Sequence, residues 1–81
     1  MITKVLIPKT GMGITEGTIT RWLKAEGEFV TAGEVIVEIE TAKAIQEVAA
    51  PVTGILKSIL LAEGHTAKVT TEIALIEERH G

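Results

Sequence analysis

Residues 17–40 read GTITRWLKAEGEFVTAGEVIVEIE, and a shift of 37 positions lays them without a gap on residues 54–77, GILKSILLAEGHTAKVTTEIALIE. Eight of the 24 aligned positions are identical. The identical pairs are Gly17 and Gly54, Leu23 and Leu60, Ala25-Glu26-Gly27 and Ala62-Glu63-Gly64, Ile36 and Ile73, and Ile39-Glu40 and Ile76-Glu77. An internal repeat of this kind indicates two units with one structural plan. We therefore expect two similar motifs packed about a pseudo-two-fold axis and joined through residues 41–53.

Short runs of β-branched and aliphatic residues alternate with turn signals along the whole chain. We expect strands at residues 5–7, 18–23, 35–40, 45–49, 55–60 and 73–76. Glycine permits the backbone angles that tight turns require, and the glycines expected in turns are Gly11, Gly13, Gly27, Gly33, Gly54 and Gly64. The predicted fold class is all-β, a small sandwich or flattened barrel without a long helix.

The composition narrows the possible functions. The chain has 81 residues, enough for one small domain with a compact core, and no cysteine for a disulfide or a thiolate metal site. Its net charge of −3 gives no basic patch for a phosphate backbone, so nucleic acid is not an expected partner. Because no apolar run approaches the roughly 20 residues that cross a bilayer, we expect no membrane partner either. The expected location is the cytoplasm, or the mitochondrial matrix if the domain comes from a eukaryotic protein.

Lys43 lies near the tip of the segment that joins the two repeats, between Ala42 and Ala44. A type I turn accepts alanine and lysine at its two central positions, so this turn would point the lysine amine into water. A catalytic lysine needs a buried or cation-rich environment, which a hairpin tip does not supply. Lys43 is therefore predicted to be a tether for a covalently attached group.

This pattern resembles the lipoyl domains of 2-oxo acid dehydrogenase acyltransferases over roughly residues 4–77. The matching residues are Gly17-Thr18-Ile19, Trp22, Glu26-Gly27-Glu28, Val30, Ala32-Gly33-Glu34, residues 38–44, Glu47, Ala50-Pro51 and Gly54. In that family the modified lysine stands sixteen residues after one glycine and eleven before another. Here Gly27 and Gly54 stand at these distances from Lys43.

The resemblance implies a flattened barrel of two four-stranded antiparallel sheets, with one carrier domain over residues 1–81 and its core at about 4–77. It also implies lipoate in amide linkage to Lys43, no metal, and no catalytic residue in the chain itself. The implied partners are a lipoate-protein ligase or lipoyl transferase, a thiamine-diphosphate decarboxylase, an acyltransferase core and dihydrolipoamide dehydrogenase. The domain would shuttle acyl groups and reducing equivalents between them, starting from a 2-oxo acid or acetoin.

The resemblance further assigns roles to residues around the lysine. The expected recognition residues are Glu40, Thr41, Ala42 and Ala44 on the hairpin and Gly11, Met12 and Gly13 on a nearby loop. The expected structural glycines are Gly17, Gly27, Gly33, Gly54 and Gly64. The chain departs from the family pattern at Ala42, where aspartate is usual, and at Thr70-Thr71, where a glycine is more frequent.

Two alternatives to a lipoyl carrier remain open on the sequence. Biotin carrier domains share the fold and hairpin, but they typically flank their lysine with methionines, whereas this chain has Ala42 and Ala44. An export adaptor could use the same fold as an unmodified interaction module, with Lys43 an ordinary surface residue.

Other polar residues have simpler interpretations than an active site. Glu38, Glu40 and Glu47 fit solvent-facing strand positions better than a catalytic carboxylate pair. His65 and His80 lack partners at metal-ligand spacing and are expected at the surface, without a metal centre. Trp22 is expected to pack in the core.

Overall fold

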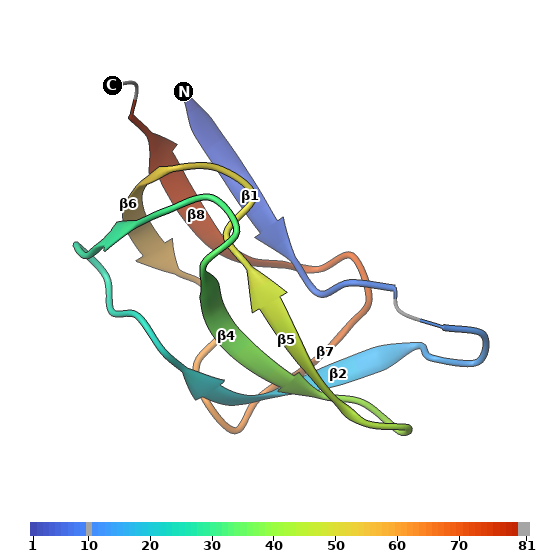
Figure 1. Cartoon of the computed structure of the whole chain (residues 1–81). Coiled ribbons are helices and arrows are strands. Elements are labelled where there is room, and N and C mark those ends of the chain that lie inside the picture. The colour runs from blue at the N-terminus through green and yellow to red at the C-terminus, as the bar shows by residue number, and fades with distance from the viewer. Residues whose placement is uncertain (10, 80–81) are drawn as a thin grey trace.

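The computed structural model describes residues 1–9 and 11–79, and all regular elements in these ranges are β-strands (Figure 1). They are β1 (Ile2–Leu6), β2 (Glu16–Trp22), β3 (Phe29–Val30), β4 (Val35–Glu40), β5 (Ile45–Ala49), β6 (Gly54–Ile59), β7 (Thr66–Lys68) and β8 (Glu72–Glu78). Within the described ranges, no helix has the length and apolar character needed to cross a bilayer. The all-β expectation is confirmed, the short strands β3 and β7 are additional to those expected, and His80 lies outside the described residues.

The strands form two four-stranded antiparallel sheets, ordered β1-β8-β6-β3 and β5-β4-β2-β7. The shift of 37 residues found in the sequence places β2 on β6, β3 on β7 and β4 on β8. It also reproduces an irregularity, because the β2–β4 register shifts between Ile19 and Arg21 and the β6–β8 register between Leu56 and Ser58. The expected pseudo-two-fold arrangement is therefore present down to the β-bulges.

Hydrogen bonds between the halves obey the same symmetry. The Gly27 N–H donates to the Leu56 carbonyl at 2.7 Å, and the Gly64 N–H donates to the Ile19 carbonyl at 2.8 Å. Each turn glycine thus binds a strand of the opposite half, so the two repeats interlock instead of standing side by side.

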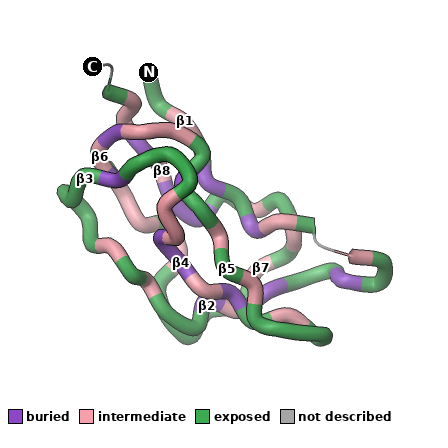
Figure 2. The backbone as a smooth tube through the Cα atoms, in the orientation of Figure 1, coloured by how far each residue is buried: buried purple, intermediate pink, exposed green. Residues whose placement is uncertain are grey.

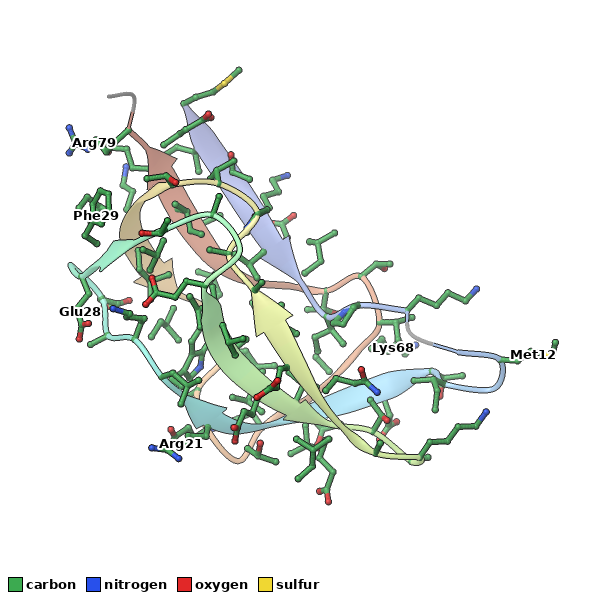
Figure 3. All side chains as sticks on the ribbon, in the orientation of Figure 1. Met12, Arg21, Glu28, Phe29, Lys68 and Arg79 are labelled. Atoms are coloured by element: carbon green, nitrogen blue, oxygen red, sulfur yellow. The ribbon has the colours of Figure 1, made fainter. Side chains whose placement is uncertain are left out.

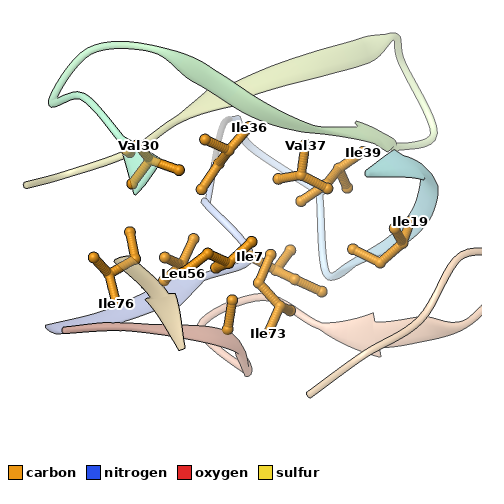
Figure 4. Close-up of a cluster of buried hydrophobic side chains, with 12 residues drawn as sticks. Ile7, Ile19, Val30, Ile36, Val37, Ile39, Leu56, Ile73 and Ile76 are labelled. Atoms are coloured by element: carbon orange, nitrogen blue, oxygen red, sulfur yellow. The ribbon is translucent and has the colours of Figure 1, made fainter. Parts of the chain in front are cut away.

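Aliphatic side chains from both sheets fill the space between them (Figure 4). The largest fully buried ones are Ile7, Ile19, Val30, Ile36, Val37, Ile39, Leu56, Ile73 and Ile76. Trp22 packs against this cluster and donates its indole N–H to the Leu61 carbonyl at 2.9 Å, as expected of a core tryptophan. Burial of each large aliphatic side chain contributes about 1.5–3 kcal/mol to the stability of the fold.

Glycine is required for two different reasons. The glycines with positive φ are Gly13, Gly27, Gly33 and Gly64. Gly11 and Gly54 do not belong to this group, which corrects the expectation that both adopt turn angles. Gly54 lies within β6, where a Cβ would collide with the backbone of Glu77, and a Cβ on Gly17 would lie 2.6 Å from the Cγ2 atom of Ile39. Both strand glycines therefore serve close packing.

Candidate attachment site

The lysine predicted to be a tether lies at the tip of the β4–β5 hairpin. The last paired residues are Glu40 and Ile45, which leaves a four-residue tip, Thr41–Ala44. Ala42, Lys43 and Ala44 are exposed, and Thr41 is half-buried. Figure 2 shows this tip as an exposed end of the molecule, so an enzyme can approach the lysine amine without any rearrangement of the core.

The tip closes through a side chain. The Thr41 N–H donates to the Ala44 carbonyl at 2.9 Å. The bond that would close a type I turn, from the Ala44 N–H to the Thr41 carbonyl, is replaced by a 3.3 Å bond to the Thr41 hydroxyl. That hydroxyl also accepts the Lys43 N–H at 3.4 Å and donates to the Ala44 carbonyl at 2.9 Å. The simple type I closure expected from the sequence is thus modified by Thr41.

A loop before β2 extends on the same side of the molecule as the hairpin (Figure 1). Ile14 is buried, and its N–H donates to the Gly11 carbonyl at 3.3 Å, a bond within the loop. Met12 is 91% exposed and projects from the loop (Figure 3). The loop therefore presents an apolar side chain to solvent close to the lysine hairpin.

The loop and the hairpin together form a pocket of about 350 Å³. Its lining residues are Gly13, Ile14, Thr15, Glu16, Gly17, Thr18, Glu40, Thr41 and Ala42. Of the expected recognition residues, Gly13, Glu40, Thr41 and Ala42 line this pocket, whereas Gly11, Met12 and Ala44 do not, and neither does the predicted attachment residue Lys43.

Thr18 also lines the pocket, although it was not expected among the recognition residues. Thr18 pairs with Glu40 between β2 and β4, a cross-strand contact that only the register reveals.

The charged groups at the other end of β4 are paired with each other. The Lys24 ammonium lies 3.1 Å from a Glu34 carboxylate oxygen. A hydrogen bond from the Thr31 N–H, together with Lys24, lowers the pKa of Glu34 below its usual value. Glu34 precedes β4 and Lys43 follows it, so this ion pair lies at the opposite end of β4 from the hairpin tip.

Fold and site together define a class of protein. An exposed lysine lies at the tip of a hairpin that joins two interlocked β-repeats. Such an arrangement suits a domain that carries a covalent group to enzymes elsewhere.

Comparison with known proteins identifies the family. The model of the biotin/lipoyl family, described as "Biotin-requiring enzyme", matches residues 3–76. The chain is 44% identical over 78 residues to the dihydrolipoyllysine-residue succinyltransferase component of the 2-oxoglutarate dehydrogenase complex of Staphylococcus saprophyticus, covering 96% of this chain. It is also 44% identical over 72 residues, or 89% of its length, to the acetyltransferase component of the pyruvate dehydrogenase complex of Mycobacterium bovis. The chain spans 18% and 13% of the lengths of these two relatives.

A solved structure agrees with this assignment. The lipoyl domain of the 2-oxoglutarate dehydrogenase complex from Azotobacter vinelandii superposes with a TM-score of 0.77 at 33% identity, covering 93% of this chain and 95% of that one. The chain therefore belongs to the biotin/lipoyl family, as a lipoyl carrier domain of the kind found in 2-oxo acid dehydrogenase acyltransferases.

Proposed function

We propose that Lys43 carries a lipoyl group in amide linkage and that residues 1–81 act as one carrier domain, with its core at about residues 4–77. The observation that carries this proposal is the exposed primary amine of Lys43 at the tip of a hairpin held by a fully packed core. The attached dithiolane would supply a disulfide that accepts acyl groups and electrons. The chain contributes the attachment atom and a rigid mount, and catalysis belongs to its partners.

The residues at the hairpin tip suit the attachment of a lipoyl group to Lys43. The lysine amine condenses with an activated carboxyl group, and methyl side chains on both sides, from Ala42 and Ala44, leave the approach unhindered. The same alanines disfavour a biotin carrier, which typically has methionines there. Likeness to lipoyl domains and acyltransferase components also favours lipoylation over an unmodified export-adaptor module.

The relatives named above point to partners and substrates. We infer that a lipoate-protein ligase or lipoyl transferase modifies the domain, and that a thiamine-diphosphate decarboxylase acylates it. An acyltransferase core and dihydrolipoamide dehydrogenase would then unload and reoxidise it. The acid would be 2-oxoglutarate, pyruvate or a related 2-oxo acid, and the location the cytoplasm or the mitochondrial matrix.

Partner recognition is proposed for the hairpin and the adjoining loop. Glu40, Thr41, Ala42 and Gly13 form one pocket wall, which gives a partner a shaped surface within a few residues of Lys43. Gly11, Met12 and Ala44 would add contacts around it. Ala42 removes the acidic side chain that is usual in the family, so a decarboxylase that acylates this domain would depend less on a basic contact at this position.

Intact-mass measurement after incubation with a lipoate-protein ligase, ATP and lipoate tests the proposal. One lipoyl group should be added, and the lost lysine charge should change the net charge from −3 to −4. Lys43→Arg should keep the fold to within about 0.5 kcal/mol and abolish modification. Lys68→Arg, at another exposed position, should still be modified. Unmodified wild type in the presence of active ligase would refute the proposal, and modified Lys43→Arg would mean that another lysine is the tether.

A further inference from the structure

We infer that Thr41 is a positioning residue, whose hydroxyl holds the hairpin tip in the shape that presents Lys43 to its modifying enzyme. This inference rests on the proposed lipoylation of Lys43. Thr41 is the first residue of the tip after the last paired residue, Glu40, and its half-buried side chain lines the neighbouring pocket. It therefore lies between the paired strands and the exposed Lys43.

The Thr41 hydroxyl makes three hydrogen bonds to the backbone of Lys43 and Ala44. It accepts the Lys43 N–H at 3.4 Å and the Ala44 N–H at 3.3 Å, and it donates its own proton to the Ala44 carbonyl at 2.9 Å. One oxygen thus replaces the carbonyl acceptor of an ordinary turn and also cross-links the two sides of the hairpin.

Besides the Thr41 hydroxyl, one backbone bond closes the tip, from the Thr41 N–H to the Ala44 carbonyl at 2.9 Å. Ala42 and Ala44 offer only methyl groups, and both are exposed. Thr41 is β-branched, so its χ1 angle is restricted and its hydroxyl keeps a defined direction. Ordering an exposed turn costs conformational entropy, and a tip that is already ordered in the free domain spares the ligase that cost when it binds. Thr41 therefore acts on Lys43 through the backbone of the tip.

Steady-state lipoylation of three variants of this chain tests the inference. Thr41→Val preserves the shape of the side chain and removes all three hydroxyl contacts, whereas Thr41→Ser keeps the hydroxyl. Thr20→Val is the matched control, because the Thr20 hydroxyl donates to the Glu38 carbonyl at 3.0 Å on the same sheet but away from the tip. Ligase kcat/KM should fall about five- to tenfold in Thr41→Val, the change expected for the loss of the 2.9 Å bond to the Ala44 carbonyl, since the exposed contacts at 3.3 and 3.4 Å are long and contribute little. It should stay within about twofold of wild type in Thr41→Ser and Thr20→Val.

Two further readouts separate positioning from a general loss of structure. The backbone order parameters of Lys43 and Ala44 should drop in Thr41→Val while those of the β4 and β5 strands stay unchanged. Acylation of Lys43 by a small N-hydroxysuccinimide ester should proceed at the same rate in wild type and Thr41→Val, because the amine itself is not altered.

The possible adverse results distinguish a failure of the positioning role from a failure of the proposed lipoylation. Equal ligase kinetics for wild type and Thr41→Val would overturn the positioning role and leave lipoylation standing. A parallel loss in Thr20→Val, or in the reaction with the small ester, would also overturn it. Wild type that no ligase modifies would refute the proposed function itself.

Discussion

Thr70 stands in the second repeat where Gly33 stands in the first, and both residues have positive φ, 69° and 90°. Their N–H groups make equivalent bonds, from Gly33 to the Ala50 carbonyl at 2.9 Å and from Thr70 to the Ile7 carbonyl at 2.7 Å. A β-branched residue in the left-handed region is strained, whereas glycine is not. The departure noted in the sequence at Thr70 therefore marks a conformation that the repeat imposes against the preference of the residue.

Thr70→Gly should stabilise the domain by about 1 kcal/mol, which raises the Tm of a domain of this size by about 4–8 °C. Gly33→Thr should lower it by a similar amount, because no atom lies within 4 Å of the added Cβ and only the backbone preference is changed. Thermal unfolding followed by circular dichroism measures both changes. Thr71→Gly is the control, since the adjacent threonine has no positive φ and should lose stability on the same substitution. Equal Tm losses in Thr70→Gly and Thr71→Gly would contradict the strain argument.

At the scale of elements, the long strands could be predicted and the short ones could not. Runs such as Val35–Glu40 are defined by their own pattern of branched apolar residues. β3 has only two residues, Phe29 and Val30, and exists because they pair with Ile55 and Gly54 of β6. By contrast, the position of Lys43 at a hairpin tip could be predicted, because Lys43 lies in the segment that joins the two repeats. The hydroxyl closure by Thr41 depends on a side-chain rotamer that no sequence pattern encodes.

Two symmetry-related glutamates tie the ends of strands to turns of the opposite half. The Glu26 carboxylate accepts the Ile59 N–H at 2.7 Å, and the Glu63 carboxylate accepts the Trp22 N–H at 2.8 Å. Glu26→Ala and Glu63→Ala should each lower the free energy of unfolding by about 1–2 kcal/mol, because each leaves a strand N–H without its charged acceptor. Urea unfolding monitored by tryptophan fluorescence and circular dichroism measures the losses.

The matching glutamine variants should recover part of this loss, since an amide oxygen still accepts a hydrogen bond. Glu47→Ala removes an exposed strand glutamate and should change stability by no more than about 0.5 kcal/mol. A loss in only one of Glu26→Ala and Glu63→Ala would show that the two contacts are equivalent in geometry but not in energy.

At the scale of the whole molecule, neither half of the repeat can fold as a separate sheet. Each four-stranded sheet takes two strands from the first half, β1 to β4, and two from the second, β5 to β8. Within one half, only β2 with β4 or β6 with β8 can pair. A two-stranded hairpin is marginal in water, so the core forms only when both halves are present. The lysine hairpin is the covalent link between them, and its tip contributes nothing to the buried core.

Cutting the chain between Ala42 and Lys43 should therefore give two fragments, 1–42 and 43–81, that are each unfolded alone and fold together on mixing. The cut removes bonds only at the exposed tip, whereas all six strand pairings can re-form. Because a short linker supplies an effective concentration of about 1 mM, and a small domain is stable by about 5 kcal/mol or more, the dissociation constant should be on the order of 1 µM or tighter. Titration of one isotope-labelled fragment with the other, followed by NMR, measures it.

A cut between Lys57 and Ser58 divides β6, which pairs with both β8 and β3, and should prevent reconstitution at the same concentrations. A dispersed spectrum from fragment 1–42 alone, or no folding of the mixture at 100 µM, roughly a hundred times that constant, would show that the halves do not depend on each other as the shared sheets require.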